Sequence, residues 1–153
     1  MFQIRKPTLS DLPLLTDIAR KSFLESHGHS ASPIDIENYM AGKFTEAALE
    51  TELLDERNIF HLICHDGRPA GYSKIILDVP SENIPEPHVT KLERLYLLEA
   101  FHGLQLGYQL FDFNVQISKQ AHQSGIWLFT WTENHRAIAF YQRLGFQIVG
   151  KSN

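Results

Sequence analysis

The alternation of hydrophobic and polar residues divides the chain into short strand-like and longer helix-like segments. Phe2 to Arg5 has the pattern of a short strand, and Thr8-Leu9-Ser10-Asp11 has the pattern of a capping box at the start of a helix. Ser32-Pro33 and Thr45 mark the starts of two further helices, the second running through Leu54. The first helix is traced by apolar residues at helical spacing, namely Leu12, Leu15, Ile18, Ala19 and Phe23.

The rest of the chain alternates between strand and helix patterns. Asn58 to His65 and Ala70 to Leu77 flank an Asp66-Gly67 turn, which is typical of a β-hairpin. After a proline-containing loop, the pattern predicts strands over 89–97, 126–132 and 146–149, and helices over 106–121 and 135–144. Because a helical crossover allows strands to pair in parallel, we predict a mixed α/β sheet in a single domain, residues 1–153.

Composition fits an ordinary globular domain, with 43% hydrophobic and 21% charged residues. No apolar run approaches the ~20 residues that cross a bilayer, and the N-terminus lacks the features of a signal peptide. The one cysteine, Cys64, lies in an apolar segment, which favours core packing and excludes a disulfide framework. We therefore expect a cytoplasmic protein without a membrane partner.

The charge of the chain is unevenly distributed. The net charge of −4 argues against a nucleic-acid binder. Residues 1–88 carry 14 acidic and 8 basic side chains, whereas residues 89–153 carry 4 and 6. This suits a cationic substrate on one side and a phosphate-bearing cofactor on the other, although solvated helix faces explain it equally well. The acidic residues that would attract a polycation are Asp35, Glu37, Glu46, Glu50 and Glu52.

A glycine-containing loop over residues 98–105 joins a predicted strand to a predicted helix. A helix start exposes unpaired backbone N–H groups and the positive end of the helix dipole, so it can hold a phosphate without a basic side chain. Gly103 and Gly107 would permit close approach of the backbone. The simpler interpretation is an ordinary strand-to-helix connection.

The last predicted helix carries a tyrosine on its inner face. Asn134 is suited to start this helix and Gly145 to stop it. One face of the helix carries Ala137, Phe140, Tyr141 and Leu144, so Tyr141 points inward. At the edge of a cleft its phenol could donate a proton to a leaving thiolate, and in the core it would only be a packed residue with a satisfied hydroxyl.

These two segments resemble the cofactor motifs of the GNAT superfamily of N-acetyltransferases. The late motif has the form Asn-x-x-Ala-x-x-Phe-Tyr-x-x-x-Gly-Phe and is carried by Asn134, Ala137, Phe140, Tyr141, Gly145 and Phe146. The order of elements resembles the superfamily over nearly the whole chain, which implies a three-layer α/β/α acyltransferase fold. The segments 44–53, 70–74, 92–96 and 125–128 resemble bacterial polyamine and diamine acetyltransferases.

The chain departs from the superfamily pattern at two places. Gln105 stands where the loop usually has its central glycine, and His102 stands at the loop's usual Arg or Gln. The sequence also ends at Asn153, where superfamily members usually continue into a final strand and hairpin that cover the site. We expect either a missing or shortened terminal strand, or a neighbouring subunit of a homodimer that covers the gap.

The resemblance implies direct transfer of an acetyl group from acetyl-CoA to an amine, without an acyl-enzyme. Glu93 is the expected base, through a water, unless it is only a strand carboxylate paired with Arg94 or Lys91. Tyr141 is the expected general acid. Leu95, Tyr96 and Leu97 are expected to bind the pantetheine arm, and Asn134 and Ala137 to lie beside it. The pyrophosphate is expected at His102, Gly103, Leu104, Gln105, Leu106, Gly107 and Tyr108.

The acetyl acceptor is expected to be a small-molecule amine, with a polyamine favoured by resemblance and charge. Phe23, His27, Glu93 and Trp131 are the expected substrate-binding residues. No metal site is expected, because two histidines at i, i+2 in a loop, His27 and His29, are weak evidence for one.

Two rival functions remain open at this point, and a third is disfavoured. One is an acetyltransferase for protein N-termini or lysines, and another is a catalytically weak acyl-CoA-binding regulator. A dinucleotide-binding enzyme is disfavoured, because the glycine spacing and the following motif do not fit.

Overall fold

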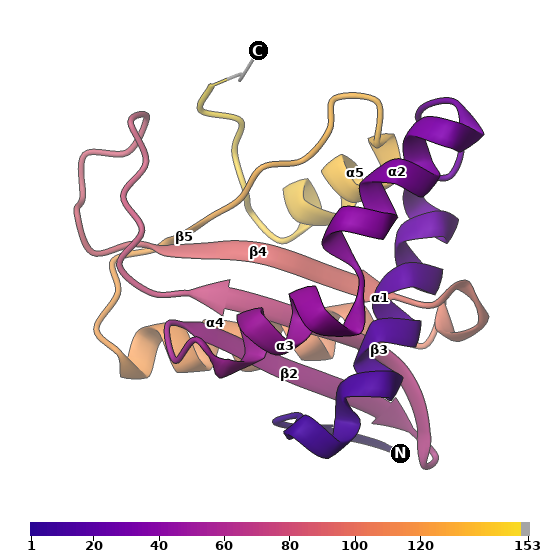
Figure 1. Cartoon of the computed structure of the whole chain (residues 1–153). Coiled ribbons are helices and arrows are strands. Elements are labelled where there is room, and N and C mark those ends of the chain that lie inside the picture. Colours follow the sequence, from indigo (N-terminus) through magenta and orange to yellow (C-terminus); the bar gives the residue numbers. More distant parts are fainter. Residues whose placement is uncertain (151–153) are drawn as a thin grey trace.

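The computed structural model describes residues 1–150 and contains one five-stranded sheet with helices on both faces (Figure 1). The strands lie in the sheet in chain order, from β1 to β5. Their bounds are β1 Phe2–Arg5, β2 Asn58–His65, β3 Arg68–Ile76, β4 Thr90–Leu97 and β5 Ile126–Trp127. The helices are α1 Leu12–His27, α2 Pro33–Lys43, α3 Glu46–Leu54, α4 Leu106–Gln120 and α5 His135–Arg143. The short 3-10 helices are η1 Leu9–Asp11 and η2 Glu99–Phe101.

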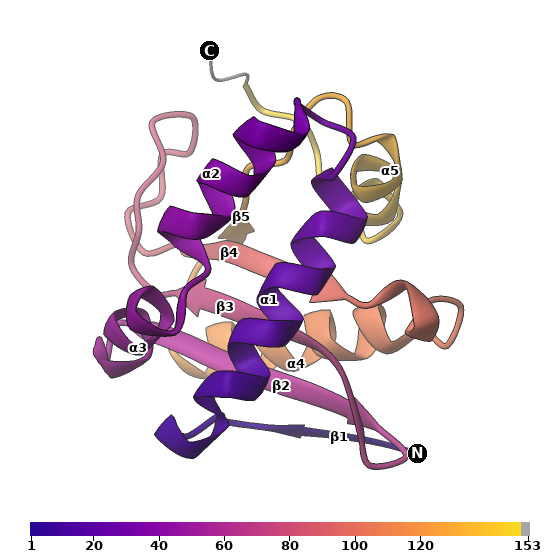
Figure 2. The same cartoon turned by 45° about the vertical axis from the view of Figure 1, so that its right-hand side comes forward.

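The sheet is mixed, as the sequence predicts. The first four strands pair antiparallel, and β5 pairs parallel with β4 after the crossover through α4. Helices α1, α2 and α3 cover one face and α4 covers the other, which gives the expected α/β/α layers (Figure 2).

Alternating side chains of the strands build a core on each side of the sheet. Phe60, Leu62 and Tyr72 pack with α1, α2 and α3, whereas Ile63 and Ala70 pack with α4. A third cluster joins the sheet to α4 and α5 through Ile75, Leu92 and Phe111, with the partly buried Tyr141, Leu144 and Phe146 against it. The helices therefore pack on both faces of a sheet that is buried along its centre.

Several predicted local signals are confirmed. The Asp11 carboxylate accepts a hydrogen bond from the Thr8 N–H at 2.8 Å, and Ser32 and Thr45 cap α2 and α3 through their side chains. The Asp66-Gly67 turn joins β2 to β3.

Two predicted strands are corrected. The strand expected over 126–132 is reduced to Ile126–Trp127, because the chain leaves β4 after these two pairs and Phe129 and Trp131 are exposed. The strand expected over 146–149 does not form, since Ile148 and Val149 are exposed and no strand lies beside them to complete a ladder. The apolar residues there reflect other contacts, such as that of Phe146 with Tyr141.

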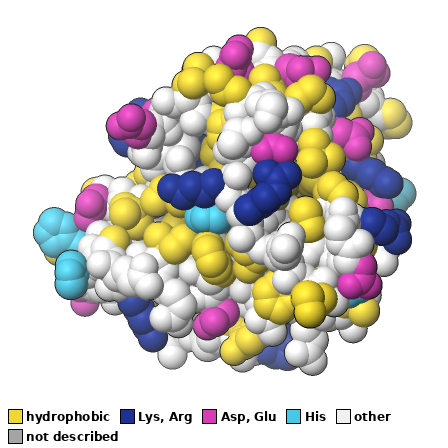
Figure 3. Space-filling model, turned by 90° about the horizontal axis from the view of Figure 1, so that it is seen from below, with side chains coloured by type: hydrophobic (Ala, Val, Ile, Leu, Met, Phe, Trp, Pro, Cys, Tyr) yellow, Lys and Arg dark blue, Asp and Glu magenta, His cyan; other side chains and the backbone are white. Residues whose placement is uncertain are grey.

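The surface shows mixed character on the face seen in Figure 3, where hydrophobic side chains lie between charged ones of both signs. Within residues 1–150 no helix is long and apolar enough to cross a membrane. The same residues contain no cluster of three or more His, Cys, Asp and Glu side chains suited to a metal ion.

Candidate active site

A cleft of about 960 Å³ opens where the two parallel strands part. Strands β4 and β5 share only the pairs Thr90 with Ile126 and Lys91 with Trp127. Beyond them, residues 92–97 of β4 form one wall of the cleft and residues 128–131 the other. The start of α4, the inner face of α5 and the C-terminal end of α1 complete the lining.

The α4 helix begins at this cleft with its backbone N–H groups free. Ser32, Thr45 and Asn134 cap the starts of α2, α3 and α5 with their side chains, but Gln105 makes no side-chain cap for α4. Within the described chain, no group accepts a hydrogen bond from the N–H of residues 106–108. An uncapped helix of 15 residues that faces a cleft is suited to bind an anion.

The loop before α4 is shaped by two residues in the left-handed region. Gly103 has a φ of 85° and Gln105 a φ of 60°. Gln105 therefore adopts the conformation that the glycine usual at this position takes without strain.

The edge of β4 that faces the cleft exposes backbone hydrogen-bonding groups. The N–H of Leu98 donates to the Ala70 carbonyl, toward β3. Because N–H groups alternate sides along a strand, those of Leu95 and Leu97 face the cleft. The Leu97 carbonyl accepts a hydrogen bond from His102 Nε2 at 3.1 Å, which requires the proton on Nε2. An extended group with amide functions can pair with this edge as an added strand.

Tyr141 lines the cleft from α5. The Asn134 side chain accepts a hydrogen bond from the Ala137 N–H at 3.1 Å, so Asn134 caps this helix. The Tyr141 ring packs against Phe140 and Phe146, with ring centroids 5.1 and 5.4 Å away. Burial raises the pKa of the Tyr141 phenol, so it stays protonated at neutral pH and is available as a proton donor.

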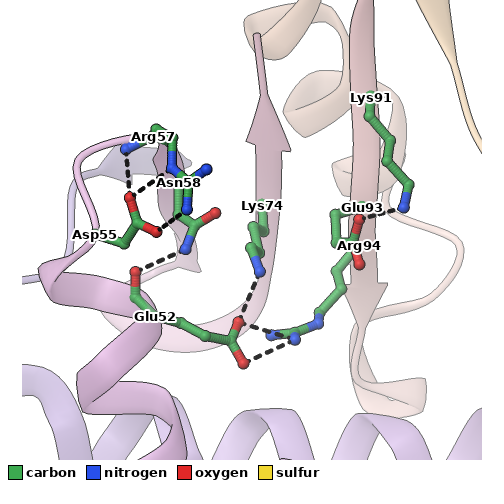
Figure 4. A network of polar contacts seen from close by, with 8 residues as sticks. All are labelled: Glu52, Asp55, Arg57, Asn58, Lys74, Lys91, Glu93 and Arg94. Carbon is green, nitrogen blue, oxygen red and sulfur yellow. Dashed lines mark hydrogen bonds and ion pairs between the residues drawn. The ribbon is translucent and has the colours of Figure 1, made fainter. Parts of the chain in front are cut away.

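Glu93 lies at a β-bulge in β4. Lys74 of β3 pairs with Arg94 and Ile75 pairs with Leu92, so Glu93 has no partner across the ladder and faces the cleft. Its carboxylate forms an ion pair with Lys91 Nζ at 2.8 Å (Figure 4). Burial raises the pKa of Glu93, but the hydrogen bond from Lys91 and nearby positive charges outweigh it and lower the pKa overall. A carboxylate with a lowered pKa is a weak proton acceptor, and the role of Glu93 as base stays a prediction.

Glu52 of α3 is held behind β4 instead of facing a substrate. Its carboxylate lies 2.8 Å from Lys74 Nζ and 2.9 Å from an Arg94 nitrogen (Figure 4). Both basic side chains are buried. The expectation that Glu52 attracts a polycation is therefore corrected, because two cations of the chain already neutralise it. Arg94 pairs with Glu52 and not with Glu93.

A second pocket of about 520 Å³ adjoins the cleft. It shares His27, Tyr96 and Trp131 with the cleft, and α1 and α2 supply its other walls. The Phe23 ring stacks on Tyr39 at 5.0 Å and lies 4.9 Å from His27. Asp35 adds the pocket's only carboxylate, and no Lys or Arg is among its lining residues in the described chain. The remaining lining residues are Ser30, Ala31 and Ile36.

The structure brings together most of the predicted site residues. All of them line the cleft except two: Leu104 is exposed outside it, and Phe23 lines the second pocket only. Sequence reasoning missed Tyr39, Phe129, Arg136 and Arg143, which line one of the two cavities. The basic excess of the C-terminal half was a signal for the two arginines, whereas no local pattern marks Tyr39.

Sequence comparison identifies the family. The profile of the acetyltransferase (GNAT) family matches residues 12–146. The chain is 31% identical over 135 residues to an uncharacterized N-acetyltransferase encoded in the pepI 3' region of Lactobacillus delbrueckii subsp. lactis, which covers 88% of this chain and 78% of that protein. It is 25% identical over 142 residues to an uncharacterized N-acetyltransferase of Mycobacterium bovis, covering 93% and 86%.

Solved structures share the fold. The PaiA N-acetyltransferase of Thermoplasma acidophilum, in complex with coenzyme A, superposes with a TM-score of 0.87 at 22% identity, covering 100% of this chain and 94% of that one. The aminoglycoside acetyltransferase AAC(6')-Iy with a bisubstrate analogue gives 0.79 at 16% identity, covering 100% and 95%. With the fold, the cleft and the sequence match in agreement, the chain belongs to the acetyltransferase (GNAT) family and is an acetyl-CoA-dependent N-acetyltransferase.

Proposed function

We propose that this enzyme acetylates a primary amine of a small cationic molecule, with polyamines and diamines as the first candidates. The observation that carries the proposal is the aromatic pocket beside the cofactor cleft. Aromatic faces attract ammonium groups, and Asp35 adds a negative charge to a pocket that no Lys or Arg lines in the described chain. A long amine can place one end in this pocket and its other end in the cleft, because the two cavities share His27, Tyr96 and Trp131.

The chain's own groups fit the expected cofactor. When bound, acetyl-CoA supplies the acetyl group as a thioester. We propose that the free N–H groups at the start of α4 and the loop from His102 hold its pyrophosphate. The cleft-facing N–H groups of Leu95 and Leu97 would bind its amide-containing arm, with Tyr96 and Ala137 lining the same space. Arg136 and Arg143, which also line the cleft, add positive charge for phosphate groups.

Tyr141 is proposed as the proton donor to the departing thiolate. The supporting facts are its place in the cleft lining and its buried, protonated phenol. Glu93 is proposed to attract the acceptor's ammonium group or to order a water beside it. Cys64 is a free thiol, which fits the cytoplasmic location that we also propose. A homodimer stays a prediction.

The proposal is tested by thiol release from acetyl-CoA with spermidine, spermine, short diamines and a lysine peptide. We expect turnover with the polyamines and diamines to exceed turnover with the peptide, because the aromatic rings and Asp35 of the second pocket favour a second ammonium group on the acceptor. Preference for the peptide would instead indicate a protein acetyltransferase. Tight coenzyme A binding without any turnover would indicate a regulator.

A Tyr141→Phe variant tests the assigned acid in the same assay. We expect kcat to fall by about 10²-fold or more, since general acid catalysis contributes on the order of 10²–10⁴-fold. Coenzyme A affinity should stay unchanged, because the ring remains. The matched control is Tyr72→Phe, which removes a buried phenol outside the cleft lining and should retain kcat. Equal kcat in the two variants would remove Tyr141 from the mechanism.

A further inference from the structure

His27 occupies the junction between the two cavities. It lies in the last turn of α1, and its side chain lines both the cofactor cleft and the aromatic pocket. Its ring lies 4.9 Å from Phe23 and 6.4 Å from Trp131, so aromatic rings flank it on two sides. Any amine that reaches from the aromatic pocket into the cleft passes this imidazole.

The Tyr96 hydroxyl links His27 to β4. His27 Nε2 lies 3.5 Å from the Tyr96 oxygen, and the two rings meet edge to face at 6.2 Å. Tyr96 also lines both cavities, three residues after Glu93 on the same strand. Burial raises the pKa of Tyr96 to about 12, so the hydroxyl is protonated and can donate to the imidazole while accepting another proton.

The groups around His27 leave it free to accept a proton. Tyr96 faces it from β4, Asp35 and Tyr39 line its pocket from α2, and Glu25 lies one half-turn earlier on α1. The Glu25 carboxylate accepts a hydrogen bond from the Glu99 N–H at 2.9 Å. Burial lowers the pKa of His27 below its usual 6.5, so the imidazole is neutral at pH 7. Glu93, in contrast, is already paired with Lys91.

We propose that His27 accepts the proton of the acceptor amine through the Tyr96 hydroxyl. This inference rests on the proposed function. The ammonium nitrogen gives a proton to Tyr96 Oη while the Tyr96 proton passes to His27 Nε2. The neutral amine forms the C–N bond as the C–S bond breaks, and Tyr141 protonates the departing thiolate. The nitrogen then loses its second proton, which restores the Tyr141 phenol through water, and His27 returns the first proton to solvent.

The test compares the pH dependence of kcat/KM for the wild type, His27→Gln and Tyr96→Phe with a polyamine acceptor. In the wild type, kcat/KM should be level from pH 7 upward and should fall at lower pH, as the imidazole becomes protonated. In both variants only amine that is already deprotonated reacts. Their kcat/KM should therefore rise about tenfold per pH unit from pH 7 to 9, because the amine pKa is about 10.4. At pH 7 the loss should be on the order of 10²-fold.

Two control variants separate this role from others. His29→Gln changes an exposed histidine of the adjoining loop and should keep the wild-type profile. Glu93→Gln should keep the pH-independent region of kcat/KM. If Glu93→Gln lost this region and His27→Gln kept it, the inference would be overturned. A merely structural role of His27 would lower the rate without changing the slope.

An NMR titration of the His27 ring provides a readout without turnover. Its pKa should lie below 6.5 in the wild type and should shift in Tyr96→Phe, because the hydroxyl contact is lost. An unchanged titration in Tyr96→Phe would overturn the relay. If the wild type acetylates none of the amines, the proposed function fails and this inference with it. Normal wild-type turnover with an unchanged His27→Gln profile would overturn the inference alone.

Discussion

At the scale of single residues, Gln105 shows how this chain keeps a loop shape without the usual glycine. The residue sits at the start of α4 with a φ of 60°, and its side chain makes no cap. An L-residue in the left-handed region costs about 1 kcal/mol more than glycine does. In this conformation Gln105 starts α4 so that the N–H groups of the next residues point into the cleft.

Gln105→Gly should therefore stabilise the protein. We expect the free energy of unfolding to rise by about 0.5–1 kcal/mol, measured by urea denaturation, because relief of strain exceeds the added entropy of the unfolded chain. Leu104→Gly is the matched control, since Leu104 is exposed and has no positive φ. It should lower stability by a few tenths of a kcal/mol to about 1 kcal/mol. A decrease in both variants would show that the φ of Gln105 is not strained.

At the scale of elements, the β3–β4 pair depends on a close backbone approach at Gly71. A Cβ at this position would meet the backbone carbonyl oxygen of Tyr96, and the Leu97 backbone lies beside it. Gly71 pairs with Leu97 across the ladder, and both Leu97 and its neighbour Tyr96 line the cleft. The small residue therefore sets the position of the edge of β4 that lines the cleft.

Gly71→Ala should destabilise the protein by about 1–3 kcal/mol, as overpacking against backbone does. Thermal or urea unfolding measures this, and coenzyme A affinity should fall with it because β4 is displaced. Gly42→Ala on α2 is the control. Nothing lies within 4 Å of its added Cβ, so it should stabilise by about 0.5–1 kcal/mol. Unchanged stability in Gly71→Ala would mean that the strands can separate at no cost.

The sequence correctly predicted those helices and strands whose ends are set by interactions between residues close in the chain. The caps at Ser32, Thr45 and Asn134 and the Asp66-Gly67 turn are local, and the helices and strands that they bound are confirmed. The prediction from sequence was wrong where a strand depends on pairing with a distant part of the chain. Residues 128–132 have strand-forming side chains, but β4 turns away from them, and no pattern within the segment shows this. For the same reason the second pocket could not be outlined, since only the fold brings Tyr39 and Trp131 to the same pocket.

At the scale of the whole molecule, one buried ionic group joins the helical layer to the sheet. Glu52 of α3 bonds Lys74 of β3 and Arg94 of β4, and the Arg94 guanidinium also lies over the Phe44 ring at 5.4 Å. Burial raises the pKa of Glu52, but the hydrogen bonds from Arg94 and Lys74 outweigh it, so the pKa is lower in the folded than in the unfolded chain. This group contributes stability that depends on pH.

Glu52→Gln should lower the free energy of unfolding by about 3 kcal/mol at pH 7, because two buried cations lose their counter-charge. In the wild type the carboxylate's contribution is complete above the unfolded pKa of about 4.5 and is lost as pH falls through the lower folded pKa. Denaturant midpoints from pH 7 to 3 should therefore fall more steeply in the wild type than in Glu52→Gln. Glu50→Gln, exposed on the same helix, should behave as the wild type. Parallel curves for Glu52→Gln and wild type would contradict this assignment.

The order of the strands also dictates how the molecule assembles. Strands β2, β3 and β4 pair antiparallel without an intervening helix longer than a turn, and the β2–β3 pair closes over a two-residue turn. The parallel pair must wait for the α4 crossover, holds only two residue pairs, and leads to α5, which has no fully buried residue. We therefore expect the segment after α4 to open more readily than the antiparallel strands. An acetyl donor that contacts both β4 and residues 128–131 would hold these two segments together. Binding of the donor would therefore also stabilise the part of the chain that opens most readily.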